Sequence, residues 1–210
     1  KVASISIRVN PDVDPKTHPY ISTGLKDNKF GVDEQNAISM YKIAKDLDSI
    51  KIKGIDCHIG SQITELHPFE DSIKKLLTLL DHLNSIGISI EHIDIGGGIG
   101  IQYSDEMPPT FADYAKTVKN ILKGRDLKII FEPGRALIGK AGLLLAEVEY
   151  IKNNLEKNFI IINAAMNDLM RPALYGAFHE IINLSPTDSE QKHYDIVGPV
   201  CETGDFLGKD

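Results

Sequence analysis

A glycine cluster in the middle of the chain is the first segment whose residue types suggest chemistry. Gly96, Gly97 and Gly98 directly follow the apolar segment His92–Ile95, and Gly100 comes two residues later. Glycine permits close backbone approach and unusual dihedral angles, so the N–H groups of such a turn can converge on a phosphate. The spacing matches neither the dinucleotide-binding fingerprint nor the P-loop lysine motif. Taken alone, the cluster is equally compatible with a purely structural turn.

A second chemically suggestive segment is Glu132-Pro133-Gly134-Arg135. The carboxylate could hold a protonated ring nitrogen, and the planar guanidinium could clamp a phosphate or a carboxylate. The alternative for this motif alone is a surface Glu–Arg pair around a Pro-Gly turn. A phosphate cradle after one strand and a carboxylate after the next are together what a phosphorylated pyridine cofactor requires. We therefore assign all four residues to a cofactor site.

A histidine and a serine stand three residues apart at the end of another apolar segment. The imidazole of His58 could stack on a flat ring, and the hydroxyl of Ser61 could reach a phosphate. An isolated histidine is more often a core or loop residue, so this assignment depends on its neighbours. Cys57 faces the opposite side of the strand pleat, and we expect it to pack beneath a helix without a function.

The last third of the chain carries two more candidate segments. Cys201 stands beside Glu202 in a stretch rich in turn formers, Gly198–Asp205, which suits a proton donor. The alternative is a buried structural cysteine, the usual fate of this residue type. Arg171 and Tyr175 lie four residues apart in an otherwise apolar stretch, which alone fits an ordinary solvated patch.

A repeated strand–helix unit must position the first of these segments. Strands are predicted from alternating or β-branched apolar residues at Ile5–Val9, Ile52–His58, His92–Ile95 and Lys128–Phe131. Helices are predicted between them from N-terminal signals: Asp33 as a cap, Pro68 in a first turn, and Thr110 with Asp113 as a capping box. A strand–helix repeat of roughly 36–48 residues indicates right-handed crossovers and a parallel sheet.

The ends of the predicted strands favour a barrel over an open sheet. Each strand ends in a polar or glycine-rich cluster, at Asn10, His58–Ser61, Gly96–Gly98 and Glu132–Arg135. An open doubly wound sheet binds its ligand at one switch point, whereas a (β/α) barrel gathers all its strand ends around one site. About four of the eight units of such a barrel are present.

The pattern changes near Gly142, beyond which the chain becomes hairpin-like. Apolar runs at 143–151 and 159–163 flank an Asn153-Asn154 turn. The predicted fold class is therefore α/β. Residues 1–142 are expected to form part of a pyridine-cofactor-binding (β/α)8 TIM-like barrel, and residues 143–210 part of a β-rich second domain.

The composition of the chain restricts the classes of binding partner that we expect for it. The net charge of −7 is spread along the chain without a basic run, which argues against nucleic acid and anionic membranes and favours a small polar substrate. Two cysteines in unlike contexts and no signal-like stretch indicate a reducing cytoplasm. We single out no metal site. The chain does not begin with Met, and we expect it to be an excerpt of a longer protein.

Over nearly its whole length the chain resembles the diaminopimelate decarboxylases, within the alanine-racemase-like (fold III) pyridoxal enzymes. The residues that carry the resemblance are Arg8-Val9-Asn10-Pro11, Lys29-Phe30-Gly31, residues 57–62, residues 94–98, residues 132–135, residues 170–175 and residues 198–202. The glycine loop and the His-Ile-Gly-Ser element also occur in ornithine and arginine decarboxylases. The Arg-Pro-Ala-Leu-Tyr and Cys-Glu-Thr-Gly-Asp segments point to the diaminopimelate branch.

The resemblance implies pyridoxal 5'-phosphate as the cofactor, carried by the barrel. Ser61, Gly97, Gly98 and Arg135 would then lie near its phosphate. His58 would stack on its ring. Glu132 would keep the pyridine nitrogen protonated. The family's Schiff-base lysine matches no segment here, and we expect it upstream of Lys1.

The resemblance also implies a substrate and a partner. The reaction would be decarboxylation of meso-2,6-diaminopimelate to L-lysine and carbon dioxide by a homodimer with shared active sites. Arg135, Arg171 and Tyr175 would bind the distal carboxylate of the substrate, and Glu202 its distal amine. Cys201 would donate a proton at the partner's site.

Two alternatives remain open at this point. The protein could be a sister decarboxylase that acts on ornithine, arginine or carboxynorspermidine. It could also be a non-catalytic homologue that keeps the fold to bind a protein partner. The 210-residue chain alone is expected to be inactive, because a partial barrel exposes strand edges and inner faces.

Overall fold

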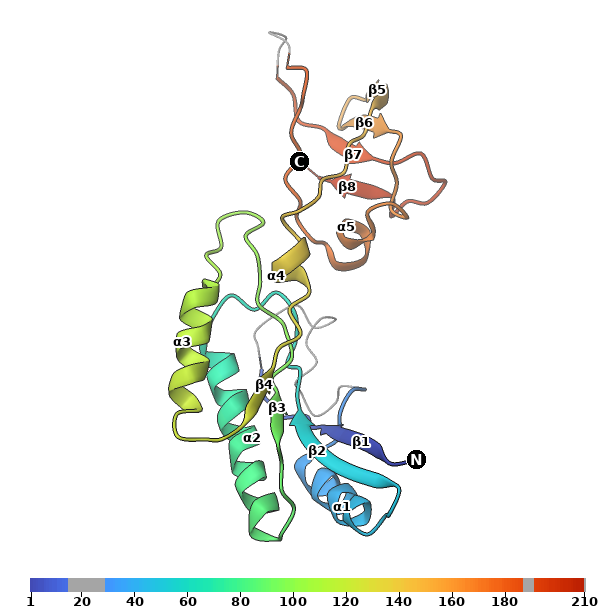
Figure 1. The fold of residues 1–210 in the computed structure, drawn as a ribbon. Coiled ribbons are helices and arrows are strands. Elements are labelled where there is room, and N and C mark those ends of the chain that lie inside the picture. The colour runs from blue at the N-terminus through green and yellow to red at the C-terminus, as the bar shows by residue number, and fades with distance from the viewer. Residues whose placement is uncertain (15–28, 187–190, 210) are drawn as a thin grey trace. The chain divides into compact units, whose positions relative to one another are not determined.

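A computed structural model describes residues 1–14, 29–186 and 191–209 of the chain, drawn in Figure 1. The described residues divide into two compact units. The first contains Lys1–Ile101 and Met107–Ala141. The second contains Gly142–Asp210 together with the short segment Gln102–Glu106.

The first unit is a parallel sheet with helices between successive strands (Figure 1). Its strands, in spatial order, are β1 (Ala3–Arg8), β2 (Ile50–Asp56), β3 (His92–Asp94) and β4 (Lys128–Ile130). Its helices are α1 (Glu34–Lys45), α2 (His67–Ser85), α3 (Phe111–Ile121) and the short α4 (Arg135–Ile138). The parallel α/β arrangement confirms the predicted fold class, with strand bounds that differ from the prediction by one to two residues at most ends. Helix α4 was not predicted.

Two helices begin at the capping residues that the sequence predicted. The Asp33 side chain accepts a hydrogen bond from the Asn36 N–H at 2.9 Å and caps α1. The Thr110 hydroxyl accepts one from the Asp113 N–H at 3.1 Å and caps α3. Each cap satisfies a backbone donor that the first helical turn leaves without a partner. The chain therefore turns from loop to helix at positions that its own side chains determine.

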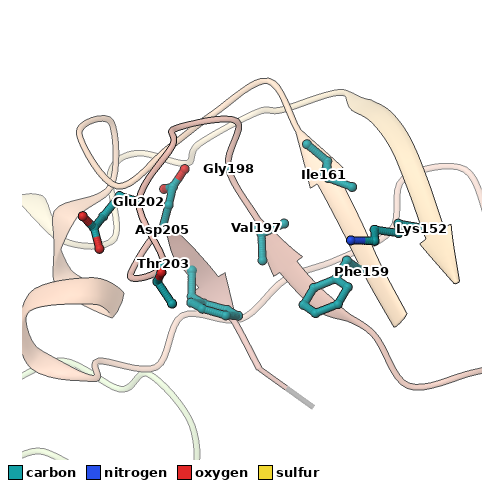
Figure 2. Close-up of a pocket in the computed structure, with 9 residues that line it drawn as sticks. Lys152, Phe159, Ile161, Val197, Gly198, Glu202, Thr203 and Asp205 are labelled. Atoms are coloured by element: carbon teal, nitrogen blue, oxygen red, sulfur yellow. The ribbon is translucent and has the colours of Figure 1, made fainter. Parts of the chain in front are cut away.

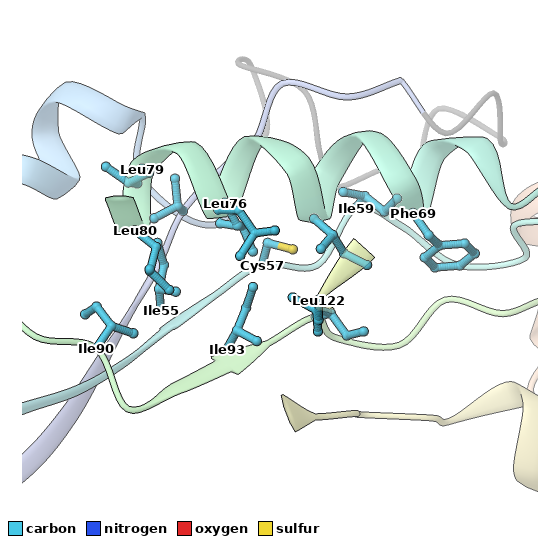
Figure 3. Close-up of a cluster of buried hydrophobic side chains, with 14 of the residues drawn as sticks. Ile55, Cys57, Ile59, Phe69, Leu76, Leu79, Leu80, Ile90, Ile93 and Leu122 are labelled. Carbon is cyan, nitrogen blue, oxygen red and sulfur yellow. The ribbon is translucent and has the colours of Figure 1, made fainter. Parts of the chain in front are cut away.

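Helix α2 contributes seven of the 24 buried residues of the first core, more than any other element. Its apolar side chains pack against the sheet, as Figure 3 shows for Leu76, Leu80 and Phe69. Each such side chain contributes about 1.5–3 kcal/mol by leaving water. Cys57 is buried in this cluster, which confirms its predicted place beneath a helix. Burial raises the pKa of the Cys57 thiol to about 12, so it stays protonated and unreactive at neutral pH.

The outer strands of this sheet leave apolar surface uncovered. Strand β4 is at one end of the four-stranded order, and Ile130 and the adjacent Phe131 are 40% and 43% exposed. Strand β1 is at the other end. Among the described residues, β1 and β4 are the outermost strands, and the exposed apolar residues at β4 are of the kind that a complete barrel covers with further strand–helix units.

The second unit is built on a mixed four-stranded sheet. Strands β5 (Val148–Asn153) and β6 (Asn158–Ile162) form the antiparallel hairpin that the sequence indicated. Strand β7 (Asp195–Val197) pairs parallel to β6, and β8 (Phe206–Gly208) pairs antiparallel to β7. Helix α5 (Met170–Tyr175), which was not predicted, ends at a left-handed Gly176. Within the described ranges of both units, no helix is long and apolar enough to cross a membrane.

Candidate functional site

The loops that follow β2, β3 and β4 are hydrogen-bonded to one another at the carboxyl edge of the first sheet. The Gly97 N–H donates to Nδ1 of His58 at 3.2 Å, and the Glu132 N–H donates to the Gly96 carbonyl at 2.8 Å. The sheet register aligns the ends of β2 and β3, with Asp56 opposite Asp94. Three of the predicted site segments are thus adjacent in space, although up to 74 positions separate them in the sequence.

The glycines of this edge are required by backbone packing. A Cβ atom on Gly97 would lie 2.1 Å from the Glu132 carbonyl oxygen, and one on Gly98 would lie 2.4 Å from the Gly60 carbonyl oxygen. Gly98 also has φ +108°, which L side chains rarely adopt. The turn can therefore present only backbone atoms between the neighbouring loops. Such a surface suits a phosphate, and the close packing leaves no room for a side chain at Gly97 or Gly98.

His58 is half-buried, and its ring is held in one protonation state. Burial, and secondly the positive charge of Arg8, lower the pKa of His58 below 6.5. The imidazole is therefore neutral at pH 7. Because its Nδ1 accepts the Gly97 N–H, the ring proton resides on Nε2. A neutral, oriented imidazole at a strand end is suited to stacking on an aromatic ring.

Glu132 belongs to a group of carboxylates that the sequence patterns did not reveal. Partial burial raises its pKa, and the negative charges of Asp94 and Asp56 raise it further. Asp56 and Asp94 are the last residues of their strands, and the Ser6 hydroxyl donates to Asp56 at 2.9 Å. The available signal was an acidic residue ending each of two apolar strands. This negative field favours a cation such as a protonated ring nitrogen.

Arg135 stands in the first turn of α4 beside a glutamine that we had not singled out. Its Nη1 donates to the Gln62 side-chain oxygen at 3.1 Å. Gln62 is itself fixed, because the same oxygen accepts from the Ile101 N–H at 3.1 Å and its amide donates to the Ile101 carbonyl at 2.5 Å. Ser61 is half-buried next to Gln62. The Gln62 contact thus orients the guanidinium, which can bind an anion through its planar set of N–H donors.

In the second unit, Arg171 is surrounded by aromatic rings. Its guanidinium lies over the Tyr103 ring at 4.9 Å, and its Nη1 is 3.0 Å from Nε2 of His179. The rings of Tyr103 and His179 meet edge-on at 5.2 Å. Tyr103 comes from the segment Gln102–Glu106, far from Arg171 in sequence. Tyr175 is on the same helix as Arg171. Neither Tyr103 nor His179 was singled out from the sequence, since their contacts are non-local.

The Cys201 turn is solvent-accessible in the second unit. Cys201 is exposed whereas Cys57 is buried, so the alternative of a buried structural cysteine at Cys201 is wrong. Glu202 is also exposed, and its side chain accepts a hydrogen bond from the Gly204 N–H at 3.2 Å. Figure 2 shows Glu202 and Thr203 at one side of a shallow pocket, with Lys152 and Phe159 at the other. None of the proposed cofactor residues lines this pocket.

The site residues therefore form two groups, each within one unit. His58, Gly97, Gly98, Glu132 and Arg135 assemble at the carboxyl edge of the first sheet. The second unit holds the substrate and proton-donor candidates, which are Arg171, Tyr175, Cys201 and Glu202. Across the described ranges, no three His, Cys, Asp or Glu side chains are grouped to hold a metal ion.

Comparison with known protein families identifies this arrangement. A family model described as the pyridoxal-binding domain of pyridoxal-dependent decarboxylases matches residues 1–139. The chain belongs to the pyridoxal-dependent decarboxylase family. The matched range contains every cofactor-binding residue inferred above.

Relatives of this chain match it over nearly its whole length. It is 53% identical over 208 residues to a diaminopimelate decarboxylase of Pseudomonas aeruginosa and 56% identical over 209 residues to one of Vibrio cholerae. Each match covers 99% of this chain and 50% of the relative, so the chain spans about half the length of these relatives. The crystal structure of diaminopimelate decarboxylase from Helicobacter pylori complexed with L-lysine superposes with a TM-score of 0.93 at 45% identity, covering 100% of this chain and 52% of that chain. The resemblance inferred from the motifs is confirmed.

Proposed function

We propose that the protein containing this chain decarboxylates meso-2,6-diaminopimelate to L-lysine and carbon dioxide with pyridoxal 5'-phosphate. The observation that carries the proposal is end-to-end similarity to diaminopimelate decarboxylases at 53–56% identity. A second observation supports the proposal: the site residues that follow β2, β3 and β4 fit this cofactor. When bound, the cofactor supplies a protonated pyridine that accepts the electron pair left by the departing carboxylate.

The residues at the first sheet's edge would hold the cofactor. The backbone of Gly97 and Gly98, the Ser61 hydroxyl and the Arg135 guanidinium would bind the phosphate, with Pro133 and Gly134 shaping the turn. The neutral imidazole of His58 would stack on the ring. Glu132 would pair with the ring N–H, and the nearby charges of Asp56 and Asp94 support a cation there.

The second unit would recognise the far end of the substrate. Arg171 and Tyr175, with Arg135, would bind the distal carboxylate, and Glu202 would bind the distal ammonium. Support comes from Arg171, whose Nε is buried and has no hydrogen-bond partner among the described residues. A substrate with a second amino-acid end requires both a cationic clamp and an acidic group. The exposed thiol of Cys201 would deliver the proton that completes the reaction.

Two rival functions make different predictions. Sister decarboxylases for ornithine, arginine or carboxynorspermidine share the glycine loop but need no site for a distal carboxylate. A non-catalytic homologue would have no need for Glu132, Arg135 and Cys201, all present here. We also propose a cytoplasmic location, because both cysteines are free.

Carbon dioxide release by the full-length protein tests the substrate assignment. We expect turnover of meso-diaminopimelate and at least about a hundredfold lower kcat/KM for ornithine and arginine, since these leave the Arg171 guanidinium without the distal carboxylate. A preference for ornithine, arginine or carboxynorspermidine would exclude the proposed substrate. Absence of turnover with all four, in protein that binds the cofactor, would favour the binding-protein alternative.

Complementation tests the proposed homodimer with shared sites. One full-length variant carries Cys201→Ala, and a second lacks the Schiff-base lysine. Equal mixing by refolding makes about half of the dimers hybrids, and each hybrid regenerates one intact site of two, so about a quarter of wild-type activity should return. If both groups act within one chain, no mixing ratio restores activity, although native mass spectrometry detects the hybrids.

A further inference from the structure

A buried carboxylate that has no part in the proposed chemistry connects two functional segments of the second unit. Asp205 is only 3% exposed. Its Oδ1 accepts a hydrogen bond from the Met166 N–H at 2.6 Å, and its Oδ2 accepts one from the Val200 N–H at 2.9 Å. A buried carboxylate is costly unless charge-assisted hydrogen bonds replace its water. Here two backbone amides from segments 34 residues apart provide them.

One of these segments is the turn that bears Cys201 and Glu202. Besides the Val200 contact, the Asp205 N–H donates to the Glu202 carbonyl at 3.1 Å, and the Gly198 N–H donates to the Asp205 carbonyl at 3.1 Å. Asp205 therefore closes this turn through both its backbone and its side chain. In Figure 2 the side chains of Glu202 and Asp205 extend from this turn in different directions.

The other segment leads directly into helix α5. Met166 lies in a short loop in which Asp168 accepts a hydrogen bond from the Ala165 N–H at 2.9 Å. The Leu169 N–H donates to the Ala165 carbonyl at 3.1 Å, one residue before α5 begins. Because this loop is internally fixed, holding Met166 in place also fixes the start of the helix that carries Arg171.

No space remains between the two segments. A Cβ atom on Gly198 would lie 2.3 Å from Oδ2 of Asp205 and 2.7 Å from both the Ala164 carbonyl oxygen and the Ala165 Cα. The Cys201 turn and the loop before α5 are therefore in direct backbone contact around the Asp205 carboxylate. In Asp205→Asn, one carboxylate oxygen becomes an NH2 donor that would face a backbone N–H, so an amide side chain can keep only one of the two hydrogen bonds.

We propose that Asp205 is a positioning residue that holds the Cys201 turn and the start of α5 at one fixed separation. The positions of the proton donor Cys201 and of the distal-end residues on α5 are thereby set by one carboxylate. This inference rests on the proposed function for the roles of Cys201 and Arg171, whereas the bridge itself is independent of them.

The test compares Asp205→Asn with Asp195→Asn in the full-length enzyme. Asp195 is a suitable control because it is fully buried in β7 of the same sheet and its Oδ2 is 2.7 Å from Lys157 Nζ. Hydrogen exchange is measured for peptides that contain Met166 and Val200, without cofactor. Steady-state kcat, KM and cofactor affinity are then measured with meso-diaminopimelate. The same exchange measurement on Gly198→Ala provides a second variant if Asp205→Asn does not fold.

We expect Asp205→Asn to accelerate exchange at whichever of the Met166 and Val200 amides then faces the NH2 group, and to lower kcat by about 10- to 100-fold, the effect of a misplacement near 1 Å. Cofactor affinity should change less than about threefold, since its residues lie in the first unit. Asp195→Asn should change neither amide. Unchanged exchange at both amides in Asp205→Asn, or equal kcat losses in the two aspartate variants, would overturn the inference.

The two hypotheses fail in different ways. If Cys201→Ala retains full activity, the proton-donor role is lost, yet the exchange data still decide whether Asp205 joins the two segments. If exchange is unchanged in Asp205→Asn while Cys201→Ala is inactive, the proposed function stands and the positioning role of Asp205 is excluded.

Discussion

Replacing Gly97 by alanine tests whether the glycine turn and Glu132 form one site. The added Cβ would lie 2.1 Å from the Glu132 carbonyl oxygen and 3.0 Å from its carbonyl carbon, where ordinary contacts begin at 3.4 Å. The opposing atoms belong to the backbone, so no flexible side chain can move aside. The two loops must separate by about 1.3 Å, which displaces the carboxylate proposed for the ring nitrogen. A displacement of this size costs about 100-fold, or about 2.7 kcal/mol, in an interaction that depends on position.

The measurement is titration of the full-length apo-enzyme with pyridoxal 5'-phosphate, followed by absorbance. Gly142→Ala is the control, because a Cβ atom there meets nothing within 4 Å. Melting of the apo forms records the separate cost of overpacking, about 1–3 kcal/mol. We expect Gly97→Ala to bind the cofactor about 100-fold more weakly while Gly142→Ala binds it normally. A Gly97→Ala enzyme with cofactor affinity within threefold of wild type would refute the argument.

Single-residue changes at Arg171 and Thr110 and the titration of His58 test three further features of the chain. Arg171→Ala should raise the KM for meso-diaminopimelate about ten- to a hundredfold, because a charge-assisted contact of about 1.5–3 kcal/mol is lost. The variant should keep its cofactor. Cofactor loss equal to that of Arg135→Ala would exclude a substrate role for Arg171. His58 should titrate below 6.5 by NMR in the apo-enzyme, because burial lowers its pKa. Because the His58 pKa is higher in the unfolded chain than in the folded chain, the unfolded chain takes up this proton at a higher pH. The free energy of unfolding should therefore fall as pH drops below 6.5, and a His58 pKa above 6.5 would contradict this. Thr110→Ala should cost about 1 kcal/mol in thermal denaturation with kcat unchanged, and an undiminished melting temperature would show that the Asp113 N–H contact is unimportant.

Local patterns were sufficient for the four strands and the three longer helices of the first unit. The caps at Asp33 and Thr110 act within three residues, so the sequence alone indicates where α1 and α3 begin. Alternating apolar residues likewise predicted the strands, and the repeat predicted their parallel order. Helices α4 and α5 were not predicted, because they are only 4 and 6 residues long and too short to show helical periodicity.

The tertiary structure decided how the site residues are held. The sequence identified Glu132 and Arg171, but the carboxylates of Asp56 and Asp94 reach Glu132 only through the sheet register. Tyr103 likewise meets Arg171 although 68 residues separate them.

The physical reason is the range of the interactions. Helix caps and strand alternation depend on neighbours along the chain, and these the sequence specifies directly. Electrostatic fields, ring contacts and the fit of the Gly97 turn against the Glu132 carbonyl depend on distances between strand ends and loops. Those distances exist only after the strands have paired and the core has packed. A shift of one residue in the strand register would turn the side chains of that strand to the other face of the sheet.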